Sequence, residues 1–171
     1  IKKMKKELLH IEKESKTAHQ KTQIMVGHTS RDVEDYLKSL TLRHNRKYKN
    51  QPHFIISKEG VVIKVLEPRV TTNFFGDKDI DDNIVLVLGN IYKGEVFEKK
   101  WRNRFFWSTY TDKQIDSLVV LLKDICADLK IEKKFIGHNV RVEGVERFKG
   151  IVTRSNYSEY FTDLSPAFNF E

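Results

Sequence analysis

Two short apolar runs each end in a glycine followed by a histidine, and this repeated pattern most constrains the fold. His28 follows Gln23–Gly27, and His138 follows Lys134–Gly137. Runs of this length and composition predict buried strands, and the side chain after such a strand end enters a cleft. A third polar residue, Asp163, stands near the end of the chain in FTDLSPAF. Because the three residues are widely separated in sequence, only the fold can bring them together.

The chemistry of these three side chains points to a metal site. Neutral imidazole and carboxylate are the ligands that zinc takes in open catalytic sites, where water fills the fourth position. The residues alone also allow a structural interpretation. A histidine at a strand end can be a hydrogen-bonded core residue, and Asp163, which precedes a proline-containing turn, can act as a turn cap.

Further elements follow from apolar spacing. Residues 32–48 have apolar side chains at helical spacing, and His53–Ile56 and Val61–Leu66 are predicted to form a hairpin around a Glu-Gly turn. Ile84–Leu88 is apolar throughout, as expected of a central strand. Alternation of strands and helices predicts an α/β domain with a mixed central sheet flanked by helices.

The longest helix is predicted from Thr111 to Ile131. Thr111 is a favourable N-cap, and Gln114 follows three residues later, as in a capping box. An apolar stripe runs along this helix: Ile115, Leu118, Val119, Leu122, Ile125 and Leu129. Cys126, the only cysteine of the chain, lies within this segment, so an intrachain disulfide is excluded and a buried structural thiol is expected.

Composition bounds the size and the partners of the domain. The chain has 171 residues, of which 39% are hydrophobic, and this suits one globular domain. Its net charge of +7 favours an anionic partner, such as nucleic acid, an acidic membrane surface or a bacterial cell wall. No apolar run approaches the about 20 residues that span a bilayer.

Three segments remain open in this interpretation. Residues 1–22 are predicted to form a basic helix that either links to another domain or packs on the core formed by residues 23–171. Residues 90–110 are aromatic and basic, and a packed loop is favoured there over a cleft wall or a nucleic-acid surface. In the polar stretch 139–162, Arg141 and Arg154 either bind carboxylates, which suit the arginine fork, or lie on a solvated loop.

The order of these motifs resembles the zinc-dependent N-acetylmuramoyl-L-alanine amidases, a fold shared with peptidoglycan recognition proteins. The similarity covers roughly residues 23 to 170 and is carried by the GH after each strand, the PHFII hairpin, the TDKQ helix start and the terminal TDLSPAF. It implies that His28, His138 and Asp163 bind zinc. It also implies hydrolysis of the bond between N-acetylmuramic acid and L-alanine by zinc-bound water. In that case, carboxylates of the muropeptide are the ligands that Arg141 and Arg154 would bind if they do not lie on a solvated loop.

The resemblance further implies action at the bacterial cell wall. If residues 1–22 are a linker, this basic helix suits a module of a larger phage or lysin polypeptide. Nucleic-acid binding is the least favoured function. His53 is expected to be a buried, hydrogen-bonded histidine rather than a fourth ligand.

The chain departs from the family where the assisting groups are expected. Pro52 replaces a tyrosine, Phe161 replaces a lysine or threonine, and the central strand carries only aliphatic residues. These positions leave a second reading open, in which the domain is catalytically degenerate and serves as a cell-wall-binding or structural module. Replacement groups are conceivable, but a surface role is favoured for each of them: Tyr48, Tyr157, Glu159 and Tyr160.

Overall fold

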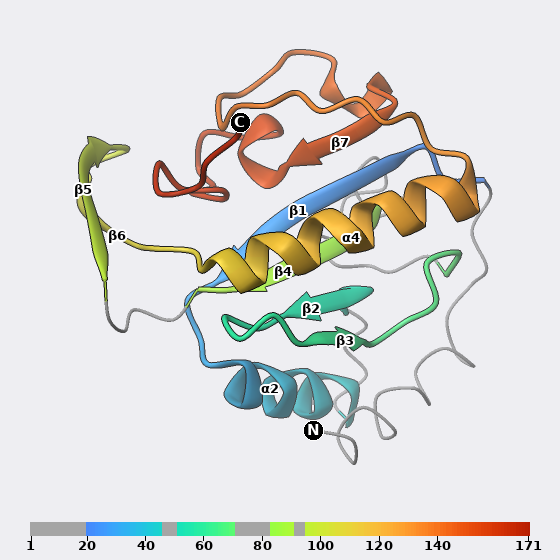
Figure 1. The fold of residues 1–171 in the computed structure, drawn as a ribbon, viewed down its shortest axis with the longest axis horizontal. Coiled ribbons are helices and arrows are strands. Elements are labelled where there is room, and N and C mark those ends of the chain that lie inside the picture. Colours follow the sequence, from blue (N-terminus) through green and yellow to red (C-terminus); the bar gives the residue numbers. More distant parts are fainter. Residues whose placement is uncertain (1–19, 46–50, 71–82, 91–94) are drawn as a thin grey trace.

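The computed structural model describes residues 20–45, 51–70, 83–90 and 95–171, which form one central sheet, flanking helices and a separate hairpin (Figure 1). The elements in chain order are β1 (Gln23–Thr29), α2 (Val33–Asn45), β2 (Phe54–Ile56), β3 (Val62–Lys64), β4 (Ile84–Gly89), β5 (Val96–Trp101), β6 (Arg104–Ser108), α4 (Asp112–Leu129), η2 (Val145–Arg147), β7 (Gly150–Thr153) and η3 (Arg154–Asn156).

The central sheet has five strands in the order β3-β2-β4-β1-β7. Strand β1 runs parallel to both of its neighbours, β4 and β7, and β2 runs parallel to β4. Only β3 is antiparallel, because a tight turn joins it directly to β2. The predicted mixed α/β sheet is therefore confirmed.

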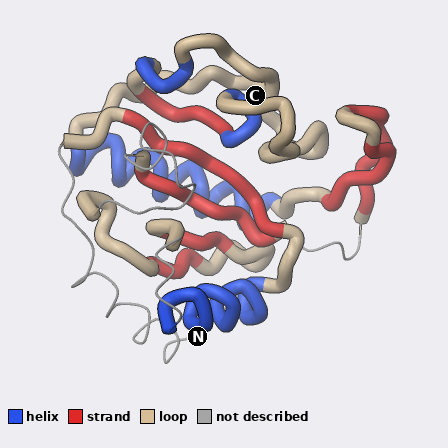
Figure 2. The backbone as a smooth tube through the Cα atoms, turned by 180° about the vertical axis from the view of Figure 1, so that it is seen from behind, coloured by secondary structure: helices blue, strands red, loops and turns tan. Residues whose placement is uncertain are grey.

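Strand β4 is apolar throughout because both of its faces are covered. Ile84, Leu86 and Leu88 pack in the core cluster that includes Leu118 and Ile125 of α4. The alternate residues Val85 and Val87 pack with Tyr36, Leu37 and Leu40 of α2. Since successive strand side chains point to opposite faces, α4 and α2 cover opposite sides of the sheet, as the two views show (Figures 1 and 2).

Helix α4 begins and packs largely as its sequence predicts. The Thr111 hydroxyl accepts a hydrogen bond from the Gln114 backbone N–H at 3.1 Å, which confirms the N-cap. The Gln114 side chain does not complete a capping box, because its amide donates to the carbonyls of Ile56 and Gly89 at 3.0 and 2.8 Å. The polar end of the helix is thus attached to the ends of β2 and β4.

Two further predictions for α4 concern the burial of Cys126 and of Val119. Cys126 is buried, as expected. Val119, expected within the buried stripe, is 42% exposed, because the face of α4 that packs on the core cluster carries residues such as Leu118 and Ile125 and does not include Val119.

Three segments differ from their sequence-based predictions. The stretch 90–110 was expected to be a loop, but it contains the antiparallel pair β5 and β6. The polar stretch 139–162 contains the edge strand β7. Residues 134–137 form only a single parallel bridge, Phe135 with Ile151, because Gly137 turns the chain at φ +77°.

Residues 1–19, which make up most of the expected N-terminal helix, lie outside the described part of the chain. Lys21, near the end of that expected segment, is buried, and its ammonium group lies 3.1 Å from His53 Nε2. None of the described helices is long and apolar enough to cross a membrane.

Candidate functional site

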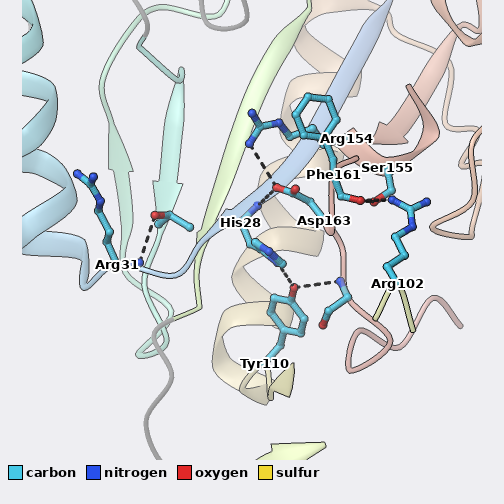
Figure 3. A network of polar contacts seen from close by, with 10 residues as sticks. His28, Arg31, Arg102, Tyr110, Arg154, Ser155, Phe161 and Asp163 are labelled. Carbon is cyan, nitrogen blue, oxygen red and sulfur yellow. Dashed lines mark hydrogen bonds and ion pairs between the residues drawn. The ribbon is translucent and has the colours of Figure 1, made fainter. Parts of the chain in front are cut away.

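His28 and Asp163 meet at the end of strand β1. The His28 backbone N–H donates to Asp163 Oδ2 at 2.8 Å (Figure 3). The close approach depends on Gly27, because a Cβ atom added there would lie 2.8 Å from the same carboxylate oxygen. The fold therefore joins two of the three predicted site residues, although they are far apart in sequence.

The His28 imidazole contacts Tyr110, which ends the connection from β6 to α4. His28 Nδ1 lies 2.6 Å from the Tyr110 hydroxyl, and that hydroxyl accepts the Ser165 backbone N–H at 3.5 Å. Burial lowers the pKa of His28, with further lowering from Arg154 and Arg104 and an opposing effect of Asp163. Burial also raises the pKa of Tyr110, so its hydroxyl keeps its proton.

Arg154 supplies the positive charge that faces Asp163. Its Nη1 lies 3.8 Å from Asp163 Oδ2, and its guanidinium lies 4.2 Å from the centre of the Phe161 ring. Asp163 is only 4% exposed, so its charge is balanced mainly from within the protein. Phe161, which stands where the family has lysine or threonine, thus provides a surface for the arginine.

His138 lies on a loop beside this pair, but it does not complete a metal-binding group with them. It is exposed, and its Nδ1 accepts the Val140 backbone N–H at 3.2 Å. The next residue, Asn139, donates to the Leu164 carbonyl at 2.9 Å, which ties the His138 loop to the Asp163 segment. Among the described residues, no three His, Cys, Asp or Glu side chains form a group that could hold a metal ion.

The donor types suit zinc, but their arrangement does not fit a three-ligand site. Asp163 Oδ2 is already engaged by the His28 N–H and Arg154, and His138 is apart. These contacts do not test zinc binding by His28, His138 and Asp163 directly, and it stays a prediction.

Arg102, in the turn between β5 and β6, connects the loops around the site. Its guanidinium donates to the carbonyls of Phe161, Ser158 and Asn139, the last at 3.2 Å. One side chain thus holds the residue after His138 and the segment before Asp163. Sequence reasoning missed this role, because nothing local distinguishes Arg102 from the cations around it.

A cavity of about 310 Å³ opens beside the His28–Asp163 pair. Two cations, Arg104 and Arg154, line it together with Asp163, Phe161 and the end of β1. We call this cavity the β1 pocket. Its mixture of arginines, a histidine and one charge-balanced carboxylate suits an anionic or amide-bearing ligand.

The residues predicted to bind substrate or to assist catalysis differ in their position relative to the β1 pocket. Arg154 lines the β1 pocket, whereas Arg141 is exposed and does not. Tyr160 lines the pocket although it is 91% exposed, while the Tyr157 hydroxyl contacts Gln23 and Asn83 instead. Glu159 is exposed, Pro52 is buried, and Tyr48 lies outside the described residues.

His53 is buried and hydrogen-bonded, as expected. The residue is fully buried, its Nδ1 accepts the Val85 N–H at 3.0 Å, and its Nε2 lies 2.7 Å from the Val70 carbonyl.

Comparison with known proteins identifies the family of this chain. The sequence model of the N-acetylmuramoyl-L-alanine amidase family matches residues 17–150, and the chain belongs to that family. The matched segment includes His28 and His138 and ends before Arg154 and Asp163. No curated protein matches the chain in sequence.

The solved structures that are similar to this chain include the following two. One is the endolysin N-acetylmuramoyl-L-alanine amidase LysCS from Clostridium intestinale, with a TM-score of 0.56 and 11% identity over 85% of this chain and 77% of that chain. The other is the Drosophila peptidoglycan recognition protein SD, with a TM-score of 0.48 and 13% identity over 81% and 72% of the two chains. At these identities, the similarity to LysCS shows a shared fold and nothing beyond it.

Proposed function

We propose that this amidase-family domain binds a muropeptide of peptidoglycan in the β1 pocket, and that it does so without zinc-assisted cleavage. The proposal rests on the two partners that the Asp163 carboxylate already has. Its Oδ2 accepts the His28 N–H and lies 3.8 Å from Arg154, while His138 stands outside the group. A carboxylate held in this way serves to position Arg154 at the pocket wall.

The ligand chemistry follows from the charges that line the pocket. Arg104 and Arg154 contribute two guanidinium groups, which form paired hydrogen bonds to carboxylates. The stem peptide of a muropeptide carries carboxylates and amides beside the lactyl group. The net charge of +7 favours the approach of the domain to an anionic wall.

Zinc-dependent hydrolysis of the bond between N-acetylmuramic acid and L-alanine is the second candidate. The contact between His28 and Asp163, and membership of an amidase family, favour it. It requires the His138 ring to join the other two side chains, through a rearrangement of a loop that Asn139 ties to Leu164.

A titration with a soluble muramyl peptide tests the binding function. Arg154→Gln should weaken binding by about 1.5–3 kcal/mol, the typical contribution of a hydrogen bond to a charged group. Arg141→Gln is the matched control, because Arg141 is exposed and does not line the pocket. Equal affinities of the two variants, or no binding by the unmodified domain, would contradict the proposal.

Metal analysis and a cleavage assay separate the two candidates. The proposal expects no stoichiometric zinc after purification in zinc-containing buffer, and no release of stem peptide from purified peptidoglycan. Stoichiometric zinc that is lost in His138→Ala, together with release of stem peptide, would establish the hydrolase instead.

A further inference from the structure

The hairpin of β5 and β6 stands apart from the main sheet. Its two strands are bonded to each other and form a separate two-stranded sheet (Figure 1). The turn residues Arg102 and Asn103 both have positive φ, 47° and 62°, as in the tight turns that match the twist of a hairpin. The aromatic and basic residues of this stretch are therefore displayed on an ordered ribbon.

Several apolar side chains of the hairpin are partly exposed to solvent. Phe97, Phe105 and Phe106 are 40%, 56% and 51% exposed, and Val96 is 40% exposed. Phe97 pairs with Trp107 across the hairpin, and successive strand residues point to opposite faces, so Phe97 and Phe105 share one face of the ribbon while Phe106 lies on the other. Exposed apolar surface of this kind marks a site of interaction with another molecule.

Cations lie directly over the aromatic rings of the same ribbon. Lys100 Nζ is 5.8 Å from the centre of the Phe105 ring, and the Arg104 guanidinium is 4.7 Å from the centre of the Trp107 ring. The Arg102 guanidinium stacks on Trp101 at 4.3 Å. The surface thus combines apolar ring faces with positive charge, and its partner must offer apolar faces and negative groups together.

The hairpin also continues the wall of the β1 pocket. Arg104 belongs to β6 and lines that pocket. Arg102, in the turn, donates to the carbonyl of Phe161, which lines the pocket as well. A polymer that leaves the pocket past Arg104 therefore meets the hairpin next.

We infer that the β5–β6 hairpin is a second contact surface for the glycan strand of peptidoglycan. The C–H faces of the sugar rings pack on Phe97 and Phe105, which share one face of the ribbon, and the carboxylates along the strand pair with the lysine and arginine side chains. The inference rests on the proposed binding of a muropeptide in the β1 pocket, since continuity with that pocket selects the glycan strand over other anionic partners.

The experiment compares two ligands that differ only in length. One is a disaccharide muropeptide, which fills the pocket alone, and the other is a peptidoglycan oligomer with several disaccharide units. The double variant Phe97→Ser/Phe105→Ser should lower the affinity for the oligomer by about tenfold or more and leave the affinity for the single muropeptide unchanged. The matched control is Val119→Ser/Val120→Ser on α4, two residues that are 42% and 60% exposed on another element.

Tryptophan fluorescence checks the hairpin directly. Both tryptophans of the chain, Trp101 and Trp107, lie in the hairpin, so their emission reports on it alone. An unchanged emission spectrum of the double variant shows that the ribbon still folds. In the unmodified domain, the oligomer should change this emission more than the single muropeptide does.

The experiment distinguishes a wrong assignment of the hairpin from failure of the proposed binding function. If the unmodified domain binds neither ligand, the binding function itself fails. If it binds both and the double variant binds the oligomer as tightly as the control, the assignment of the hairpin is overturned. It is also overturned if the double variant keeps the oligomer but loses binding to single-stranded DNA or to vesicles of anionic lipid, because the hairpin then serves a nucleic acid or a membrane.

Discussion

The His28 backbone N–H donates a hydrogen bond to the Asp163 carboxylate at 2.8 Å, and this contact joins the first strand to the last loop of the domain. Gly27 makes the contact possible, since a Cβ atom at that position would touch Asp163 Oδ2. Asp163 in turn faces Arg154. The carboxylate is therefore a structural junction, whatever chemistry the pocket performs.

Removal of this carboxylate should destabilise the domain. Asp163→Ala leaves the His28 N–H without its acceptor, and we expect the free energy of unfolding to fall by about 1–3 kcal/mol. Asp163→Asn should cost less, because an amide oxygen can still accept that bond. Urea denaturation measures both variants. If the alanine variant were as stable as the unmodified domain, the junction would have no energetic role.

Tyr110→Phe tests the support of the His28 ring. The variant keeps the edge-on packing of the ring against Phe168 at 5.4 Å and loses the hydroxyl that contacts His28 Nδ1. We expect a loss of about 1 kcal/mol in the free energy of unfolding. Tyr160→Phe is the matched control and should change nothing, because Tyr160 is 91% exposed. Similar losses in the two variants would argue against a supporting role for Tyr110.

Arg102→Lys should loosen the loops around the site. A lysine ammonium cannot reproduce the fork that serves the carbonyls of Phe161, Ser158 and Asn139. Native-state hydrogen exchange should show faster exchange in the segments around Asn139 and Phe161, with the main sheet unchanged. Arg141→Lys, an exchange of the same type at an exposed position, should leave these rates as they are. A uniform increase over the whole domain would instead indicate global destabilisation.

His53 should make the stability of the domain depend on pH. Burial is the largest cause that lowers the pKa of His53 from 6.5 to about 3, with the Lys21 cation as the second cause. The unfolded chain takes up a proton below about pH 6.5, whereas the folded domain does not until about pH 3. The contribution of His53 to the free energy of unfolding is therefore most favourable above pH 6.5. As the pH falls from 6.5 towards 3, the free energy of unfolding decreases by up to about 1.4 kcal/mol per pH unit.

The measurement is the free energy of unfolding in urea across this pH range, for the unmodified domain and for His53→Gln. Glutamine is neutral throughout, so the variant should show a shallower slope even if it is less stable at neutral pH. Parallel slopes for the two proteins would assign the pH dependence to other groups.

Local patterns predicted the sheet and the helices because their causes are local. The all-apolar run Ile84–Leu88 is a central strand with both faces covered, and Thr111 caps α4 as its residue type indicates. The hairpin of β5 and β6 was missed because its turn, Arg102–Asn103, lacks the glycine that usually reveals such turns. Strand β7 was missed because it is only four residues long and lies within a polar stretch.

The sequence by itself predicted three candidate site residues: His28 at the end of a strand, a second Gly-His after residues 134–137, and Asp163 near the end. Only the tertiary structure decided which of them meet. In the structure, the His28 N–H is hydrogen-bonded to Asp163, and Asp163 faces Arg154. The His28 imidazole contacts Tyr110, and His138 lies on a neighbouring loop. The physical reason is that strand and helix patterns arise from residues close in sequence, whereas these contacts depend on how distant loops pack around the ends of the strands.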